Sequence, residues 1–348
     1  LADVRLPSPD KITPSFPRGG SSPPSTGLDV GLPQGQPTGP VSHRYAASTC
    51  RRAVFSPAGN IIASAFRGQD VLLWARDLGI EQEPLRLVGH RGAVQCVTFA
   101  PSGAVLASAG LDQVVRLWDV HQGRELKRLQ GHTASINSVV FAPQGRILAS
   151  AGEDRTVRVW DLISGTESRT LSGHTSAVQV LAFDRGARLI ASASVDGTIK
   201  IWDVETGAQR YTFQSEQGST LALVFSPGSR TLAAVNDDNT VTLWDLESGA
   251  PRASLNDDAH RCFALAFSSS SDILMTSGLE GTIKVWSSES GEELKTYAGS
   301  PHAILSLFFE PGGNKITTRA IPLQLLDQMG ATDLAGRVAT ASKVGEKE

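Results

Sequence analysis

The sequence predicts an all-β fold made of copies of one four-stranded unit. The first observation is a fixed step of 42 residues that recurs in the positions of Trp and Phe. The residues on this step are Trp118, Trp160, Trp202, Trp244 and Trp286, together with Phe99, Phe141, Phe183, Phe225, Phe267 and Phe309. An earlier pair, Phe55 and Trp74, keeps the 19-residue interval from Phe to Trp but lies 44 residues before the next pair. A period of about 40–45 residues indicates one structural unit repeated along the chain.

The second observation is the strand pattern inside a repeat. The third repeat, residues 131–172, contains β-prone runs at 136–141, 147–151, 156–160 and 167–171, separated by turn residues such as Pro-Gln-Gly. Short strands at this spacing predict a sandwich, a barrel or a propeller. No amphipathic helical period lies between them, which disfavours alternating strands and helices. One small sheet cannot bury both faces, whereas copies stacked in a ring can.

Two dipeptides recur at fixed places in the repeats. Gly-His occurs at 89–90, 131–132 and 173–174, and Trp-Asp at 118–119, 160–161, 202–203 and 244–245. In these features the sequence resembles the WD40 repeat family, over about residues 41–327. The resemblance implies that Gly-His precedes the first strand of each sheet, or blade, and that Trp-Asp ends the third strand.

Four polar and aromatic positions recur with spacings of 18, 4 and 6 residues in the second, third and fourth repeats. They are His90, Ser108, Asp112 and Trp118; His132, Ser150, Asp154 and Trp160; and His174, Ser192, Asp196 and Trp202. The resemblance implies a buried relay in which Asp orients His, His meets Ser, and Ser meets the indole N–H. A buried Trp needs such an acceptor. A catalytic triad uses the same residue types, but a set repeated three times at scaffold spacing indicates structure, so we predict no catalytic residues.

The phenylalanine positions predict how many blades there are. Seven anchors, from Phe55 to Phe309, predict a seven-bladed WD40 β-propeller with four antiparallel strands per blade, at residues 41–341. Residues 1–40, rich in Pro, Gly and Ser, are expected to be a disordered tail or linker, and 342–348 a charged tail. The seventh repeat lacks its Trp. Its second and third strands are predicted at 315–318 and 323–327, and its fourth at 40–46 or, alternatively, 337–341.

Composition excludes several function classes. The net charge of −3 and the scattered Lys and Arg predict no direct nucleic-acid contact. Cys50, Cys96 and Cys262 share no metal-ligand spacing, and so sparse a set suggests a reducing compartment. The sequence contains no apolar run of about 18 residues, so we predict no membrane span. We therefore expect no cofactor and no metal, and a cytoplasmic location with the nucleus as the alternative.

Partner-binding positions follow from the resemblance. It implies that propellers of this family bind peptides or domains on the narrower face, through the residue before the relay Asp and residues six and four before the anchor Phe. The candidates chosen on this basis are Arg51, Glu153, Leu221, Asp237, Arg261, Phe263, Leu279 and Leu305. Aromatic, Leu and Arg residues suggest an interaction hot spot for an acidic and apolar peptide. The alternative is that Phe263, Leu221 and Leu305 only pack between blades.

The leading hypothesis is a non-catalytic scaffold that assembles an intracellular multiprotein complex. One alternative is a substrate receptor of a ubiquitin ligase. It is disfavoured because the Trp-Asp pairs continue as Val-His, Leu-Ile, Val-Glu and Leu-Glu, without the Trp-Asp-x-Arg typical of such receptors. The other alternative is the sensor or regulatory propeller of a larger multidomain enzyme, joined through the Pro-rich segment.

Overall fold

A computed structural model describes the chain over residues 13–14, 50–66, 68–75, 84–215, 219–238, 240–256, 262–278, 282–297, 303–309 and 315–321. Within these ranges every regular element is a β-strand. They contain no helix long and apolar enough to cross a membrane. The described residues form two compact units, residues 50–223 and residues 13–14 with 224–321, and the boundary falls within one strand, β18.

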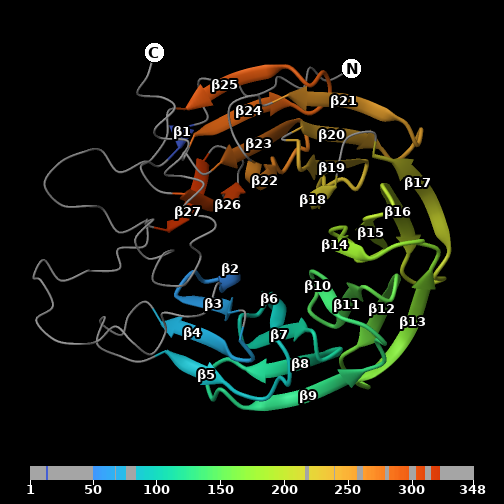
Figure 1. Cartoon of the computed structure of the whole chain (residues 1–348). Coiled ribbons are helices and arrows are strands. Elements are labelled where there is room, and N and C mark those ends of the chain that lie inside the picture. The colour runs from blue at the N-terminus through green and yellow to red at the C-terminus, as the bar shows by residue number, and fades with distance from the viewer. Residues whose placement is uncertain are drawn as a thin grey trace, which may run out of the picture. The chain divides into compact units, whose positions relative to one another are not determined.

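The larger unit contains four sheets, each with four strands in sequence order. The first two sheets are β2 (Cys50–Phe55), β3 (Ile61–Phe66), β4 (Val71–Ala75) and β5 (Leu85–Leu87), then β6 (Val94–Phe99), β7 (Val105–Gly110), β8 (Val114–Asp119) and β9 (Glu125–Gln130). The next two are β10 (Ile136–Phe141), β11 (Ile147–Gly152), β12 (Thr156–Asp161) and β13 (Thr166–Ser172), then β14 (Val178–Phe183), β15 (Leu189–Ser194), β16 (Thr198–Asp203) and β17 (Gln209–Gln214). The first strands β2, β6, β10 and β14 lie next to one another, and β5, β9, β13 and β17 form the opposite edges (Figure 1).

The other unit repeats this pattern. Its two four-stranded sheets are β18 (Thr220–Phe225), β19 (Thr231–Asn236), β20 (Thr240–Asp245) and β21 (Pro251–Asn256), and β22 (Cys262–Phe267), β23 (Ile273–Gly278), β24 (Ile283–Ser287) and β25 (Glu293–Tyr297). The six four-stranded sheets of the two units make the described chain an all-β repeat fold. In the third repeat, the four predicted strands agree with β10 to β13 to within one residue at each end.

The last repeat contributes a smaller sheet. Strands β26 (Ala303–Phe309) and β27 (Lys315–Ile321) pair antiparallel, and β1 (Thr13–Pro14) pairs parallel to β27, with Thr13 opposite Lys315. The second strand predicted at 315–318 is therefore present and extends to Ile321. Thr13 and Pro14 are the described part of the tail that was expected to be disordered. The predicted third strand at 323–327 and both candidates for the fourth, 40–46 and 337–341, lie outside the described residues.

Trp118, Trp160 and Trp202 pack the second, third and fourth sheets against the sheet that precedes each of them. Trp118 is 1% exposed and lies in one apolar cluster with Ala63, Leu73 and Leu87 of the first sheet. Trp160 and Trp202 lie in the corresponding clusters between the second and third sheets and between the third and fourth. An indole is the largest apolar side chain, so its burial stabilises the contact between neighbouring sheets strongly.

The Asp of Trp-Asp closes the turn after the third strand. Asp161 Oδ1 accepts the backbone N–H groups of Ile163 (2.8 Å) and Ser164 (3.2 Å). The turn ends at Gly165, whose φ of 72° favours glycine. Asp119, Asp203 and Asp245 accept turn N–H groups in the same way. The Trp-Asp dipeptide therefore joins a packing residue to a turn residue, and the turn directs the chain into the fourth strand.

Gly152, the last residue of β11, provides a test of the packing beside the first strand. A Cβ at this position would overlap the carbonyl oxygen of Ser135, which accepts the N–H of Glu153 (2.8 Å). We expect Gly152→Ala to lower the free energy of unfolding by about 1–3 kcal/mol, because backbone must move. Urea unfolding measures the change. The control is Val195→Ala at an exposed turn position of the next repeat, which should cost less, and equal losses would contradict the steric explanation.

Candidate functional site

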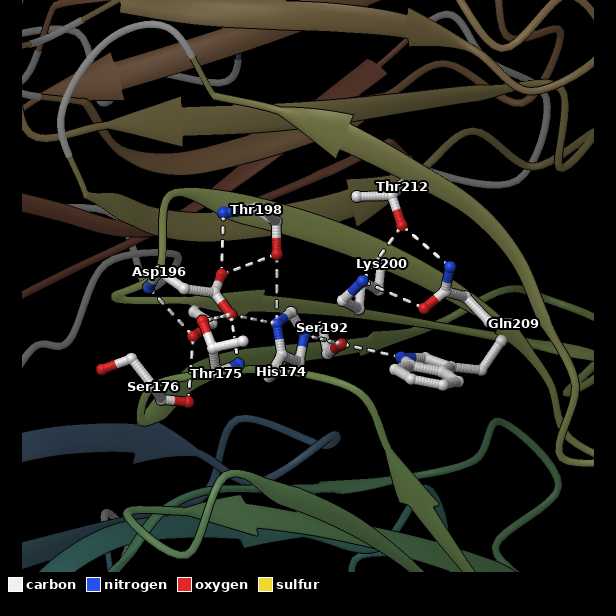
Figure 2. A network of polar contacts seen from close by, with 11 residues as sticks. His174, Thr175, Ser176, Ser192, Asp196, Thr198, Lys200, Gln209 and Thr212 are labelled. Atoms are coloured by element: carbon white, nitrogen blue, oxygen red, sulfur yellow. Dashed lines mark hydrogen bonds and ion pairs between the residues drawn. The ribbon is translucent and has the colours of Figure 1, made fainter.

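The relay residues of the second repeat form a continuous chain of hydrogen bonds. Trp118 Nε1 donates to Ser108 Oγ (2.7 Å), Ser108 bonds His90 Nε2 (2.7 Å), and His90 Nδ1 bonds Asp112 (2.9 Å). The third repeat repeats this chain through Trp160, Ser150, His132 and Asp154, with distances of 2.8, 2.7 and 2.8 Å. In the fourth repeat it runs through Trp202, Ser192, His174 and Asp196, with distances of 2.8, 2.8 and 3.1 Å (Figure 2).

Four separate segments of a repeat supply each relay. The His lies in the loop before the first strand, the Ser on the second strand, the Asp in the following turn and the Trp on the third strand. An ionised carboxylate only accepts, so each Asp receives the Nδ1–H of its His, and Nε2 then accepts the Ser hydroxyl proton. The Asp carboxylate also accepts the backbone N–H after the His, for example Thr133 to Asp154 at 3.0 Å. Each relay therefore fixes the loop onto the sheet.

Burial decides what these side chains can do chemically. Ser108, Ser150 and Ser192 are each 0% exposed, and each hydroxyl oxygen already accepts an indole N–H. A nucleophile has to reach the reacting carbon of a substrate, so these three sets hold the fold. Within the described ranges, no group of His, Cys, Asp or Glu side chains is placed to bind a metal ion.

The electrostatics of the relay favour a charged Asp and a neutral His. Burial opposes ionisation of Asp154, but hydrogen bonds from His132, Thr133 and Thr156 outweigh it and hold the pKa of the carboxyl well below its usual range. Burial lowers the pKa of His90 and of His174, against the opposing effect of their Asp partners. At neutral pH, His90 and His174 therefore each carry a single proton.

The remaining described repeats keep only parts of this network. Trp74 Nε1 donates to Ser64 Oγ and Trp286 Nε1 to Thr276 Oγ1, both at 3.0 Å. In the fifth repeat the second-strand position holds Ala234. Two residues further on, Asn236 Nδ2 donates to Thr240 (3.0 Å) and Thr242 (3.3 Å), and sequence reasoning missed these hydrogen bonds.

A second polar network, on the third and fourth strands, was also missed. Two residues before the Trp, a cation reaches an acidic residue on the fourth strand. The pairs are Arg116 with Glu125, Arg158 with Glu167, and Lys284 with Glu293. Arg116 also lies 3.6 Å from Asp112, which links the two networks in the second sheet. The signal was present in the sequence as a Lys or Arg two residues before the Trp and a Glu seven residues after it, although the pairing depends on the strand register.

The candidate partner-binding residues are placed as follows. Glu153 and Asp237 are exposed in the turns before their third strands, and Leu221 on β18 is 54% exposed, which does not fit close packing between sheets. Leu111 and Val195, which match Glu153 in position, are 50% and 54% exposed. Arg51, Phe263 and Leu305 lie on the strands β2, β22 and β26. Arg261 and Leu279 lie outside the described residues.

A β-bulge falls at the same position in six first strands. The strand registers skip one residue between the paired residues Cys50 and Arg52, and at the corresponding places in the other sheets. The skipped residues are Arg51, Gln95, Asn137, Gln179, Phe263 and Leu305. A bulge leaves its extra residue outside the ladder and redirects its side chain, and bulges are common beside functional sites. The fourth position before these six anchor Phe residues is therefore structurally distinct.

The second, third and fourth sheets each have a Gly-His loop before the first strand and Trp-Asp at the end of the third, and this combination defines a repeat of the β-propeller type. The family model described as "WD domain, G-beta repeat" matches residues 82–119, 123–161, 165–203, 207–245 and 250–287, more than half of the chain. The chain belongs to the WD40 repeat family.

Several curated proteins are similar to parts of the chain. Protein groucho of Drosophila melanogaster is 31% identical over 83 residues, which are 24% of this chain and 11% of that protein. Small ribosomal subunit protein RACK1 of Caenorhabditis elegans is 36% identical over 86 residues, 24% of this chain and 25% of that protein. The human U5 small nuclear ribonucleoprotein 40 kDa protein is 49% identical over 41 residues, 12% of each. The alignments span only a minor part of each relative.

Removing the relay Asp tests what the network contributes to stability. We expect Asp154→Ala to lower the free energy of unfolding by about 1–3 kcal/mol, because buried His132 loses its partner. Urea unfolding of Glu153→Ala, an exposed neighbour, is the matched control and should show almost no change. If the two variants were equally stable, His132 would not need its carboxylate.

The lowered pKa values of the buried histidines predict a loss of stability in mild acid. Below about pH 6.5 the unfolded chain binds protons at His90 and His174, whereas the folded chain keeps them neutral. The free energy of unfolding should therefore fall between pH 7.5 and pH 5.5. Urea unfolding at both values measures this, and His174→Gln should reduce the difference. The same difference in the variant as in the wild type would contradict this cause.

Proposed function

We propose that the chain is a non-catalytic protein–protein interaction scaffold that assembles an intracellular multiprotein complex. It binds peptides or domains through the bulged residues of the first strands and the exposed turn residues before the relay Asp. Membership of the WD40 family supports this role, and so does the use of every complete Ser-His-Asp set for holding the fold.

The observation that carries the proposal is the contrast between a repeated frame and varied display positions. The relays have the same residue types and nearly the same distances in three sheets. At the bulges the residue changes from Arg51 to Gln95, Phe263 and Leu305. At the turn position before the relay Asp, Leu, Glu, Val and Asp follow one another along the chain. Such variation on a constant frame gives a composite surface that a specific protein partner can recognise.

A protein partner fits the charge distribution better than a nucleic acid does. Two of the relatives are named for RNA–protein particles, the ribosomal subunit and the U5 ribonucleoprotein. In this chain, however, several basic side chains pair with carboxylates of the same repeat, as Arg86 with Asp70, Arg210 with Asp203 and Arg252 with Asp245. Nucleic-acid binding draws on free Lys and Arg that neutralise phosphates. We therefore propose that the chain would join such a particle through protein contacts.

The proposal includes a seven-bladed propeller. Six four-stranded sheets and the β26–β27 hairpin occupy the repeat positions of the seven anchor Phe residues. The described strands β1 and β27 pair in parallel, which supports a contribution of the N-terminal segment to the last sheet. A cytoplasmic location follows from the sparse cysteines and is part of the proposal.

Affinity capture from a cell extract, with quantitative mass spectrometry, tests whether partners bind through the proposed first-strand positions. Arg261→Glu and Phe263→Ala should each reduce the recovery of a specific set of proteins by about tenfold or more, as hot-spot changes do. Glu247→Ala, in the turn between β20 and β21, is the control and should leave that set intact. Unchanged capture by both variants would place the partner elsewhere.

A further inference from the structure

In the fourth sheet, a buried cation is held by neutral groups alone. Lys200 on β16 is 9% exposed, and its Nζ donates to Gln209 Oε1 (3.0 Å) and Thr212 Oγ1 (3.1 Å) (Figure 2). Among the described residues, no carboxylate oxygen forms an ion pair with this ammonium within 4 Å. Asp196, in the turn before β16, already accepts hydrogen bonds from His174, Thr175 and Thr198. A buried charge without a counterion is costly to keep.

The other sheets show what is missing. In the second, third and sixth repeats, the same two strand positions hold a cation and a Glu, and each pair is joined by an ion pair. Only the fourth-strand partner differs in the fourth repeat, where Gln209 replaces the Glu. The change removes one negative charge and leaves the cation in place. The missing group is therefore a single carboxylate.

The surroundings of the Gly-His glycine show the same difference in space. A Cβ on Gly89 would lie 3.2 Å from Arg116 Nη1, and one on Gly131 would lie 2.6 Å from Arg158 Nη1. At Gly173 the three nearest atoms belong to Gln209 and Trp202, the last of them at 4.0 Å, so Lys200 lies no closer. The place taken by a guanidinium nitrogen in the other sheets is thus not filled by Lys200.

We propose that Lys200, Gln209 and Thr212 form a docking site for one carboxylate of an acidic side chain of a protein partner. Gln209 and Thr212 are exposed on β17, the free edge of the fourth sheet, so a partner can reach Lys200 by displacing the Gln209 side chain. The incoming carboxylate accepts from the ammonium and from the Thr212 hydroxyl. A single carboxylate balances the charge of Lys200, whereas a phosphate dianion adds an unbalanced charge. The inference rests on the proposed scaffold function and adds a second surface, at the edge opposite the bulges.

The repeats provide a matched pair of variants for the test. Gln209→Glu supplies an internal carboxylate to Lys200, and Glu167→Gln removes one from Arg158. Acetate is the probe, exchanged for chloride at constant ionic strength, and the indole ¹H–¹⁵N signals of Trp202 and Trp160 are the reporters. In the wild type, acetate should shift the Trp202 signal and leave the Trp160 signal in place. Gln209→Glu should abolish the Trp202 shift, and Glu167→Gln should create one at Trp160.

Other results would overturn the proposal. An acetate shift of Trp202 that persists in Gln209→Glu, or no shift in the wild type, would remove the site. A larger response to inorganic phosphate than to acetate would also overturn it, because the site would then take free anions. Dispersed indole signals in both variants show that they fold. The acetate titration needs no protein partner, so a negative result would not bear on the proposed binding through the first-strand bulges. A negative capture experiment, in turn, would not bear on the Lys200 site.

Discussion

The buried indole N–H is the constraint on which each complete repeat depends. A Trp large enough to join two sheets brings its indole N–H, its only side-chain donor, into the apolar layer between them, where no water can accept its hydrogen bond. Ser150 accepts that N–H, His132 accepts the Ser proton, and Asp154 accepts the His proton. Each hydrogen bond satisfies one buried polar group but brings in another that needs a partner, until the bonds reach the loop before the first strand. The burial of one Trp therefore fixes four segments of a repeat relative to one another.

The two long edges of a sheet carry different chemistry. At the first-strand edge the bulges release single side chains from the ladder. At the fourth-strand edge cations from the third strand meet carboxylates, and the charges cancel within the sheet. Lys200 breaks this cancellation at one place. The repeats therefore combine a constant interior with two edges whose residues vary for different reasons.

The sequence was sufficient for most of the fold because period and residue type carried the information. Strands β10 to β13 and the residue types of the relay follow from the 42-residue step. The bulges did not follow, because register depends on how two strands align and not on either strand alone. The pairing of Arg158 with Glu167 has the same cause. Asn236 was missed because its network uses neighbours on one hairpin, and β1 because two residues carry no periodic pattern.

The first-strand bulge has an evolutionary consequence. Strand pairing does not fix a residue that lies outside the hydrogen-bonded ladder, although its side chain can still make contacts, as Asn137 does with the carbonyl of Val178 in the next sheet. Each duplication of a repeat thus copied a frame together with one position that the ladder leaves open to change. Arg51, Gln95, Asn137, Gln179, Phe263 and Leu305 are the present contents of these positions. Under the proposed function, single substitutions at these positions would change what the chain recognises while its sheets stay folded.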